Sequence, residues 1–415
     1  MTDMNNTPPS NGHGENDDEN EAAPQFLHGN RLFSHDALRE KIDAQFYAEN
    51  EGISPLYTAD EPTQREALRD VVDYVLATEA ISLTRQERAR LQDELFRDLL
   101  GGGPLTELVA DQSVNEIEIR SPYELFVRRY GEDAKPSTAS FRDTLHLERS
   151  LRRWLAPTGF DLTHEQFIET GITLGGRAVR LTVITSSKTL VQSASLRLHP
   201  TRARNLDDLI ADQMMDEAAV SLMRAILTRG YGLMLAGEAN SGKTTLLQAL
   251  LSELQGAKTA VVERASELRL SDEMQRLVVT PEHTFPTQIN AAVNSGRDMI
   301  VLDEMRFDES AAMWDALTAD HHPRCLWIVR GSSEPIRLRT AFSMAVRRTR
   351  QGIEQLFINS ALLDRLPFVA FLGRRENRYK VLRIGEWVSV PGDPSSLELH
   401  QLWPAENGTT SSRLT

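Results

Sequence analysis

The sequence predicts an α/β fold, in which an N-terminal helical segment and a first α/β domain precede a second, nucleotide-binding α/β domain. Three observations indicate this order. Residues 31–100 repeat apolar side chains at helical spacing, and residues 101–204 contain short runs typical of strands. From residue 232, a glycine-rich loop separates a strand-like run from a helical run. A chain of 415 residues is long enough for such a multidomain arrangement.

Residues 1–30 are polar and acidic, and they offer too little apolar surface for an ordered core, so we expect a disordered tail. Residues 31–100 then contain the helical patterns DALREKIDAQFYAE, QREALRDVVDYVLATEA and TRQERARLQDELFRDLL. Thr84 and Glu87 have the spacing of a capping box at the start of the third pattern. We expect a small helical bundle, and the sequence leaves open whether it is a docking module or a packed cap.

The first α/β domain is expected over residues 101–204, because GGGPL ends the helical pattern and four β-type runs follow: VNEIEIR, ELFVRRY, GITLGGRAVRLTVIT and ASLRLHP. One amphipathic helix, Asn205 to Gly230, is expected to lead into the second domain, which we extend to residue 390. That domain is expected to close with a hairpin whose turn is Arg375 to Arg378. After Pro391 the composition becomes turn-rich, so residues 391–415 are assigned to a C-terminal tail, in which ENGTTSSRLT is expected to be loose.

The stretch GEANSGKT contains a complete P-loop pattern, and Thr245 follows it at the start of a helix. The flanking runs GLMLAG and TTLLQALLSEL supply the strand and the helix that the motif requires. In such a loop, glycines let backbone N–H groups converge on phosphate oxygens, and the helix dipole favours the same anion. Lys243 would reach the β and γ phosphates, and Thr244 would hold Mg²⁺. The nucleotide-binding residues predicted here are Gly237, Glu238, Ala239, Asn240, Ser241, Gly242, Lys243, Thr244 and Thr245.

Acidic residues follow two strand-like runs downstream of the P-loop. DMIVLDEMR contains Asp303 and Glu304, and we assign Asp303 to the metal side and Glu304 to the attacking water. Either residue could instead be an ordinary acid that caps the next helix. KTAVVERASELRL contains Glu263 and Glu267, which are further catalytic candidates for which a plain structural role is equally compatible.

Composition restricts the class of protein. The only cysteine, Cys325, excludes an internal disulfide framework and fits a reducing cytoplasm. No apolar run approaches the length of a membrane span, so we expect a cytoplasmic chain that reaches membranes through partners. The net charge of −14 disfavours a nucleic acid as a direct ligand.

In their order, the motifs resemble those of the secretion-superfamily hexameric ATPases, nearest to the Tad (Flp) pilus assembly ATPases of the CpaF type and their conjugation relatives. The resemblance covers about Leu99 to Trp387. LLGGGPLTELVADQSVNEIEIRSPYELFVRRYG resembles the opening signature of the family, and GGRAVRLTV and SASLRLHP resemble its two arginine-bearing strands. VVERASEL stands at the acidic box, IVLDEMRFDES at the Gly-Glu-x-Arg segment, and HPRCLWIVRGSSEPIRL at the histidine box.

The resemblance implies a homo-hexamer in which each subunit holds ATP between its N-terminal domain and a RecA-like domain with a central, mostly parallel sheet. It places Arg177 and Arg197 on arginines that reach the nucleotide, although each could be a solvated strand residue on sequence alone. It also places His321 on the first histidine of the histidine box as a catalytic residue. The implied partner is a platform protein of the inner membrane, at whose cytoplasmic face the ATPase would sit.

Three departures from the family pattern bear on turnover. Glu263 is followed by Arg264 where the family has an acid, Asp303 replaces a glycine, and Val329 stands where a second histidine is usual. The loop, Lys243 and Glu304 are intact, so two interpretations remain open. The first is a motor that hydrolyses ATP for pilus assembly, secretion or conjugative transfer, with Arg330 as a substitute cationic sensor. The second is an ATP-binding hexameric scaffold with little turnover.

Overall fold

The structure is a computed structural model, which describes residues 25–28, 31–50, 54–185, 193–254, 258–306, 309–376, 378–405 and 410–414. These residues fall into two compact units. The first contains residues up to 50 together with Asp60–Phe96, and the second contains residues 54–59 together with Arg97 onward. Most of the tail expected over residues 1–30 lies outside the described residues.

The first unit is helical, as the sequence predicts. It contains α1 (His35–Glu49), α2 (Glu61–Thr78) and most of α3 (Arg85–Leu99), preceded by an antiparallel pair of strands, β1 (Gln25–His28) and β2 (Arg31–Ser34). The boundary expected at residue 30 is therefore wrong, because Gln25–His28 pairs with β2. The capping box is confirmed: the Thr84 amide donates to Glu87 Oε2, and the Glu87 amide donates to Thr84 Oγ1.

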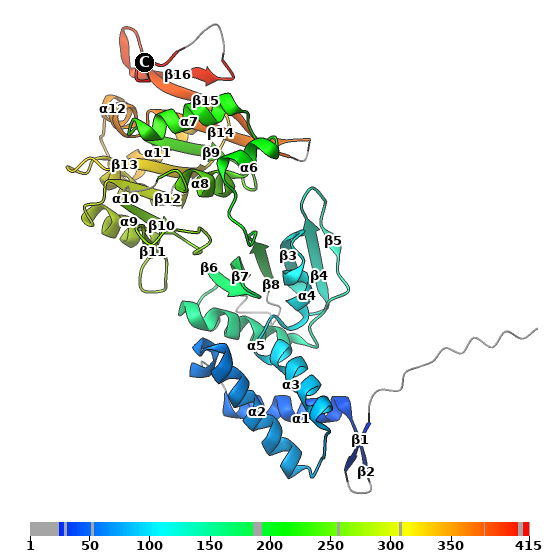
Figure 1. Cartoon of the computed structure of the whole chain (residues 1–415). Coiled ribbons are helices and arrows are strands. Elements are labelled where there is room, and N and C mark those ends of the chain that lie inside the picture. Colours follow the sequence, from blue (N-terminus) through cyan, green and yellow to red (C-terminus); the bar gives the residue numbers. More distant parts are fainter. Residues whose placement is uncertain are drawn as a thin grey trace, which may run out of the picture. The chain divides into compact units, whose positions relative to one another are not determined.

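The second unit begins with a six-stranded antiparallel sheet in the order β5-β4-β3-β8-β7-β6. Short helices and α5 (Thr144–Leu155) accompany the sheet (Figure 1). One face buries Ile117, Leu181 and Leu196 in a core shared with Leu151 of α5. The strands are β3 (Val114–Ser121), β4 (Glu124–Arg129), β5 (Lys135–Pro136), β6 (Phe167–Leu174), β7 (Arg177–Ile184) and β8 (Ser193–Leu198), and the short helices are η1 (Pro55–Thr58), η2 (Gly103–Leu105), α4 (Thr106–Ala110) and η3 (Ala156–Thr158).

An eight-stranded sheet follows in the same unit, in the order β11-β10-β12-β13-β9-β14-β15-β16. The strands from β11 to β14 are parallel, and the last two pairings are antiparallel, which confirms a mostly parallel central sheet. The strands are β9 (Leu233–Gly237), β10 (Thr259–Glu263), β11 (Gln275–Val278), β12 (Met299–Met305), β13 (Arg324–Arg330), β14 (Phe368–Arg375), β15 (Arg378–Val390) and β16 (Asp393–Trp403).

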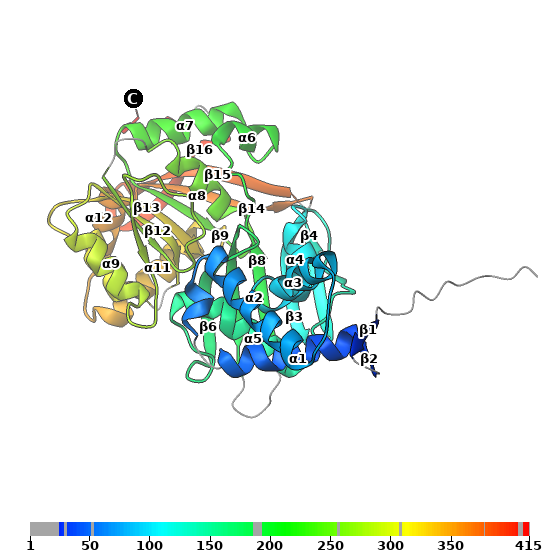
Figure 2. The ribbon, with the colours of Figure 1, turned by 60° about the horizontal axis from the view of Figure 1, so that its bottom comes forward.

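Helices cover both faces of this sheet, because its central strands are apolar on both sides. One core joins Leu235 and Val301 to α6 (Leu206–Ala211), α7 (Glu217–Thr228) and α8 (Lys243–Leu251). The other joins Ala236 and Ile300 to the opposite set of helices (Figure 2). These are α9 (Phe285–Asn294), α10 (Ser310–Leu317), α11 (Pro335–Thr349) and α12 (Gln355–Arg365).

Two further sequence predictions need correction, and one is confirmed. The single helix expected over Asn205 to Gly230 is two helices, because the chain turns after α6 with a positive φ at Gln213. Residues 393–403 are not a tail, since they form β16 and pair with β15, and Leu397 is buried. The hairpin between β14 and β15 is confirmed, with Arg375 opposite Arg378.

Candidate nucleotide site

The P-loop connects β9 to α8 at the carboxyl edge of the parallel strands. Asn240 and Gly242 have positive φ angles of 56° and 89°, which fold the loop back toward the helix. A Cβ on Gly237 would lie 2.4 Å from the Leu372 carbonyl oxygen of β14, so this position requires glycine. No side chain caps the first turn of α8, and its N–H groups point to where a phosphate would bind.

Lys243 is buried within the loop. Its ammonium donates to the Glu238 carbonyl oxygen at 2.6 Å and to Ser241 Oγ at 3.3 Å, positions from which it can turn to a phosphate. Burial, to which the charges of Arg197 and Arg330 add, lowers the pKa of Lys243 to about 8. An anion at this position would restore the charged form of the amine.

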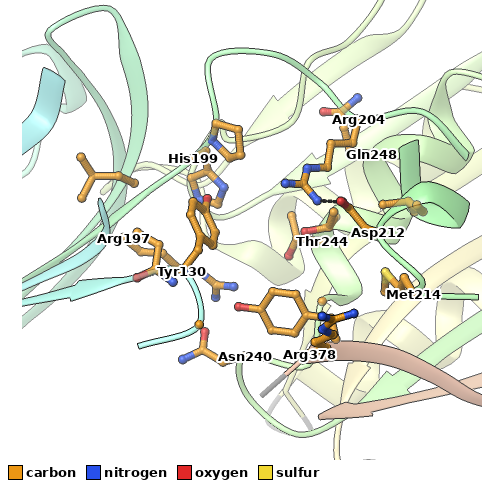
Figure 3. A pocket seen from close by; sticks show the side chains of 18 of the residues that line it. Tyr130, Arg197, His199, Arg204, Asp212, Met214, Asn240, Thr244, Gln248 and Arg378 are labelled. Atoms are coloured by element: carbon orange, nitrogen blue, oxygen red, sulfur yellow. Dashed lines mark hydrogen bonds and ion pairs between the residues drawn. The ribbon is translucent and has the colours of Figure 1, made fainter. Parts of the chain in front are cut away.

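Two adjoining cavities meet at the P-loop, and both are lined by residues of the two sheets. The larger, of about 520 Å³, contains Tyr130, Met214 and Tyr379, and Figure 3 shows the first two of these side chains with Thr244. The smaller, of about 250 Å³, contains Lys243 and lies against the acids of β12. The residues common to both cavities are Glu116, Arg197, Asn240, Gly242 and Thr244. The larger cavity therefore suits a base and sugar, and the smaller one suits terminal phosphates.

Glu304 and Asp303, at the carboxyl end of β12, line the smaller cavity as their predicted roles require. Glu304 Oε2 accepts from Arg180 Nη1 at 3.0 Å and from Arg306 Nη2 at 3.3 Å. Burial opposes its ionisation, but these two guanidiniums lower the pKa of Glu304. Burial, together with the neighbouring acid Glu267, raises the pKa of Asp303 to about 8 although Arg180 opposes the shift.

The other two predicted acids lie beside this pair. Glu267 accepts both Nε and Nη2 of Arg180 at 3.0 Å and lies 2.7 Å from His199 Nε2. Burial opposes the shift, but Arg180 and the hydrogen bond with His199 lower the pKa of Glu267. Glu263 Oε2 accepts from the Leu268 amide at 2.9 Å, and burial raises its pKa to about 7. Glu263 therefore supports the turn after β10 and does not line either cavity.

Arg177 does not reach the nucleotide site, contrary to the sequence prediction. Its guanidinium makes four hydrogen bonds to backbone carbonyl oxygens, those of Val109, Asp111, Val114 and His199, and the residue is 1% exposed. The reason is strand parity, because Arg177 shares a face of β7 with the core residues Val179 and Leu181.

Arg197 lies on the opposite face of the same sheet and lines both cavities, as expected for a residue that faces a nucleotide. The register places it directly opposite Arg180 of β7 and Glu116 of β3. The sequence prediction missed Arg180, although the alternation of VRLT in β7 was a signal that could have identified it.

His321 lies at the wrong edge of the sheet for the predicted role. It is exposed and precedes β13, whereas the P-loop lies at the carboxyl end of that strand. The seven residues of β13 span about 20 Å at about 3.3 Å per residue. At the correct edge, Val329 is buried, and Arg330 is exposed and lines the smaller cavity.

The residues described contain no group of three histidine, cysteine or acidic side chains placed to hold a metal. Mg²⁺ is usually held in proteins by one or two side chains, water and substrate phosphates, so Thr244 with Asp303 fits that mode. In the same described part of the chain, no helix has the length and hydropathy needed to cross a bilayer.

Together, the strand, P-loop, helix and strand-end acids define a P-loop ATPase. A family model described as Type II/IV secretion system protein matches residues 98–329, which is more than half of the chain. The chain therefore belongs to the type II/IV secretion system protein family.

Two curated relatives and one solved structure are similar to this chain. A putative conjugal transfer protein of Mycobacterium tuberculosis is 28% identical over 241 residues, which cover 55% of this chain and 68% of that protein. The probable conjugal transfer protein TrbB of Sinorhizobium fredii is 22% identical over 277 residues, or 65% of this chain and 84% of TrbB. The crystal structure of the ATPase DotB from Legionella pneumophila shares the fold, with a TM-score of 0.50 and 15% identity over 69% of this chain and 82% of DotB.

Proposed function

We propose that the chain is the ATP-hydrolysing subunit of a homo-hexameric motor that powers pilus assembly, secretion or conjugative transfer. The observation that carries the proposal is the smaller cavity, where Lys243 of the P-loop and Glu304 of β12 meet arginines from the other sheet. Such an arrangement can bind terminal phosphates, neutralise developing charge and orient a water. The names of the curated relatives favour conjugative transfer among these cargoes.

The residues have distinct roles in this proposal. Lys243 and the first N–H groups of α8 bind the phosphates, and Arg197 and Arg330 neutralise charge from two sides. Thr244 and Asp303 would hold Mg²⁺, which supplies further charge neutralisation at the phosphates when it is bound. Glu304 accepts a proton from the attacking water or orients it.

The proposed partners are five further copies of the chain and a platform protein of the inner membrane, to whose cytoplasmic side the ring would bind. A second candidate function is an ATP-bound scaffold in the same kind of machine. It is favoured by one observation, that a buried valine, Val329, stands where the family resemblance leads us to expect a histidine.

Steady-state ATP hydrolysis by the purified chain separates these two functions. We expect turnover in the wild type, loss of nucleotide binding in Lys243→Ala, and retained binding with turnover lowered about a hundredfold or more in Glu304→Gln. Light scattering with and without nucleotide would report ring formation. Tight ATP binding without turnover, even with membranes of the native host, would support the scaffold and contradict the motor.

A further inference from the structure

Arg180 of β7 is the centre of an ion cluster that joins the two sheets of the second unit. Its guanidinium lies within 3.4 Å of four carboxylates: Glu169 of β6, Glu267 after β10, and Asp303 and Glu304 of β12. The Arg180 side chain is only 10% exposed. One cation thus contacts two acids of the sheet that carries the P-loop, a third acid in the turn after β10, and one acid of its own sheet.

Beside Arg180, strand β6 packs directly against the turn that follows β10. Gly171 of β6 is the residue directly opposite Arg180 in the register. A Cβ on Gly171 would lie 1.7 Å from the carbonyl oxygen of Ala265, which belongs to the turn after β10. Glycine at this position lets the turn approach the strand so closely that the guanidinium can reach Glu267 and Asp303.

The same cluster pairs Glu304 with arginines, which prevents it from activating the attacking water as proposed above. Two guanidiniums, from Arg180 and Arg306, share Glu304 Oε2. Arg306 is itself bound to Glu169 Oε2 at 2.7 Å. A carboxylate that is engaged by two cations is a weak base and is not free to orient a water.

The cavity that would receive terminal phosphates is lined by Arg180 as well as by Lys243 and Thr244. A terminal phosphate carries more negative charge than one carboxylate and has three oxygens for a guanidinium fork. It can therefore compete with Glu304 for Arg180, while Glu267 and Asp303 keep the arginine in place.

We propose that Arg180 is a positioning residue that clamps Glu304 in an ion pair between the two sheets and releases it when a terminal phosphate occupies the smaller cavity. This inference rests on the proposed function, because it assigns Arg180 a role in the same site. Replacing Arg180 would remove both the tie between the sheets and the group that responds to a bound nucleoside triphosphate. A diphosphate leaves the clamp closed.

The experiment uses the full chain and compares the wild type with Arg180→Ala, Arg180→Lys and the control Arg224→Ala. Arg224 of α7 forms an exposed pair with Glu253, which follows α8, and it lines neither cavity. Hydrogen exchange of the segments containing β6, β7 and β12 is measured without nucleotide, with ADP and with a non-hydrolysable ATP analogue. The affinities for ADP and the analogue and the kcat and KM for ATP are measured in parallel.

We expect the wild-type exchange in β7 and β12 to change with the analogue and not with ADP. In Arg180→Ala, exchange without nucleotide should rise tenfold or more, and the ADP affinity should stay within twofold. The kcat should fall at least tenfold although Glu304 is freed, because the terminal phosphate loses the guanidinium that it engages. Arg180→Lys should restore part of the protection without restoring kcat, because an ammonium keeps the charge and loses the fork. Arg224→Ala should match the wild type in every measurement.

Two results would overturn the clamp. One is a wild-type exchange pattern that is the same with ADP and with the analogue, and this result requires no variant to fold. The other is a normal kcat in Arg180→Ala or Arg180→Lys. A wild type that binds the analogue and never hydrolyses ATP would overturn the proposed motor instead, and the exchange comparison would still decide whether the clamp exists.

Discussion

The depressed pKa of Lys243 predicts that nucleotide binding weakens as the pH rises through 8. Lys243 is 7% exposed, and burial lowers its pKa from 10.5 to about 8. In the free protein, the neutral amine therefore becomes the major form above pH 8. Only the ammonium attracts phosphate, so a neutral Lys243 must take up a proton when the nucleotide binds. Because protons become scarcer as the pH rises, the binding affinity falls with each further pH unit.

The size of the effect follows from these two pKa values. If phosphate restores the ordinary pKa, the dissociation constant should rise about eightfold between pH 7.5 and pH 9. Proton uptake on binding should grow from about 0.2 to about 0.9 protons over the same range. The terminal phosphate has its last pKa near ~6 and contributes little to this change.

Calorimetric titration in buffers of different ionisation enthalpy measures both quantities. Lys243→Arg is the matched control, because a guanidinium stays charged throughout this range. Asp303, whose pKa is also about 8, titrates in both proteins, so the affinity of this variant should vary with pH between 7.5 and 9 less than that of the wild type. The reasoning is refuted by a wild-type affinity that is constant over this range, or by an arginine variant that weakens to the same extent as the wild type.

Three further predictions concern stability. Arg177→Met should lower the free energy of unfolding by about 3–5 kcal/mol in a urea titration, because it leaves four carbonyl oxygens without their donor; an effect below about 1 kcal/mol would contradict this. Gly171→Ala should cost about 3 kcal/mol because its Cβ meets the Ala265 carbonyl, whereas Gly331→Ala, whose Cβ would have only Leu338 nearby at 3.8 Å, should cost much less. Burial raises the pKa of Glu263 from 4.5 to about 7. Between these two pH values, the folded chain retains a proton that the unfolded chain releases. The stability that this group contributes therefore falls as the pH rises. Glu263→Gln should therefore lose less stability than the wild type between pH 5 and 7, by at most about 1.4 kcal/mol per pH unit, and equal slopes for the two proteins would contradict the assignment.

Much of the site could be predicted from short-range patterns in the sequence. The P-loop is local: its glycines, Lys243 and Thr244 are fixed by the strand and helix on either side of them. Glu304 could also be predicted, because it stands near the end of an apolar run that is typical of a strand. Alternation along β7 separates Arg177, which shares the core face, from Arg180, which faces the smaller cavity. The match to the family pattern selects Arg177, which is the wrong residue.

The sequence by itself determined the helical character of the first segment, the parallel sheet and the glycine loop between β9 and α8, because periodicity and loop geometry depend on residues close together in the chain. Only the tertiary structure decided which acids share Arg180, since those contacts join residues up to 124 positions apart. It also decided that His321 lies at the far edge of the sheet and that residues 393–403 form β16. Each of these depends on which strands become neighbours and in which direction they run, and no local pattern contains that information.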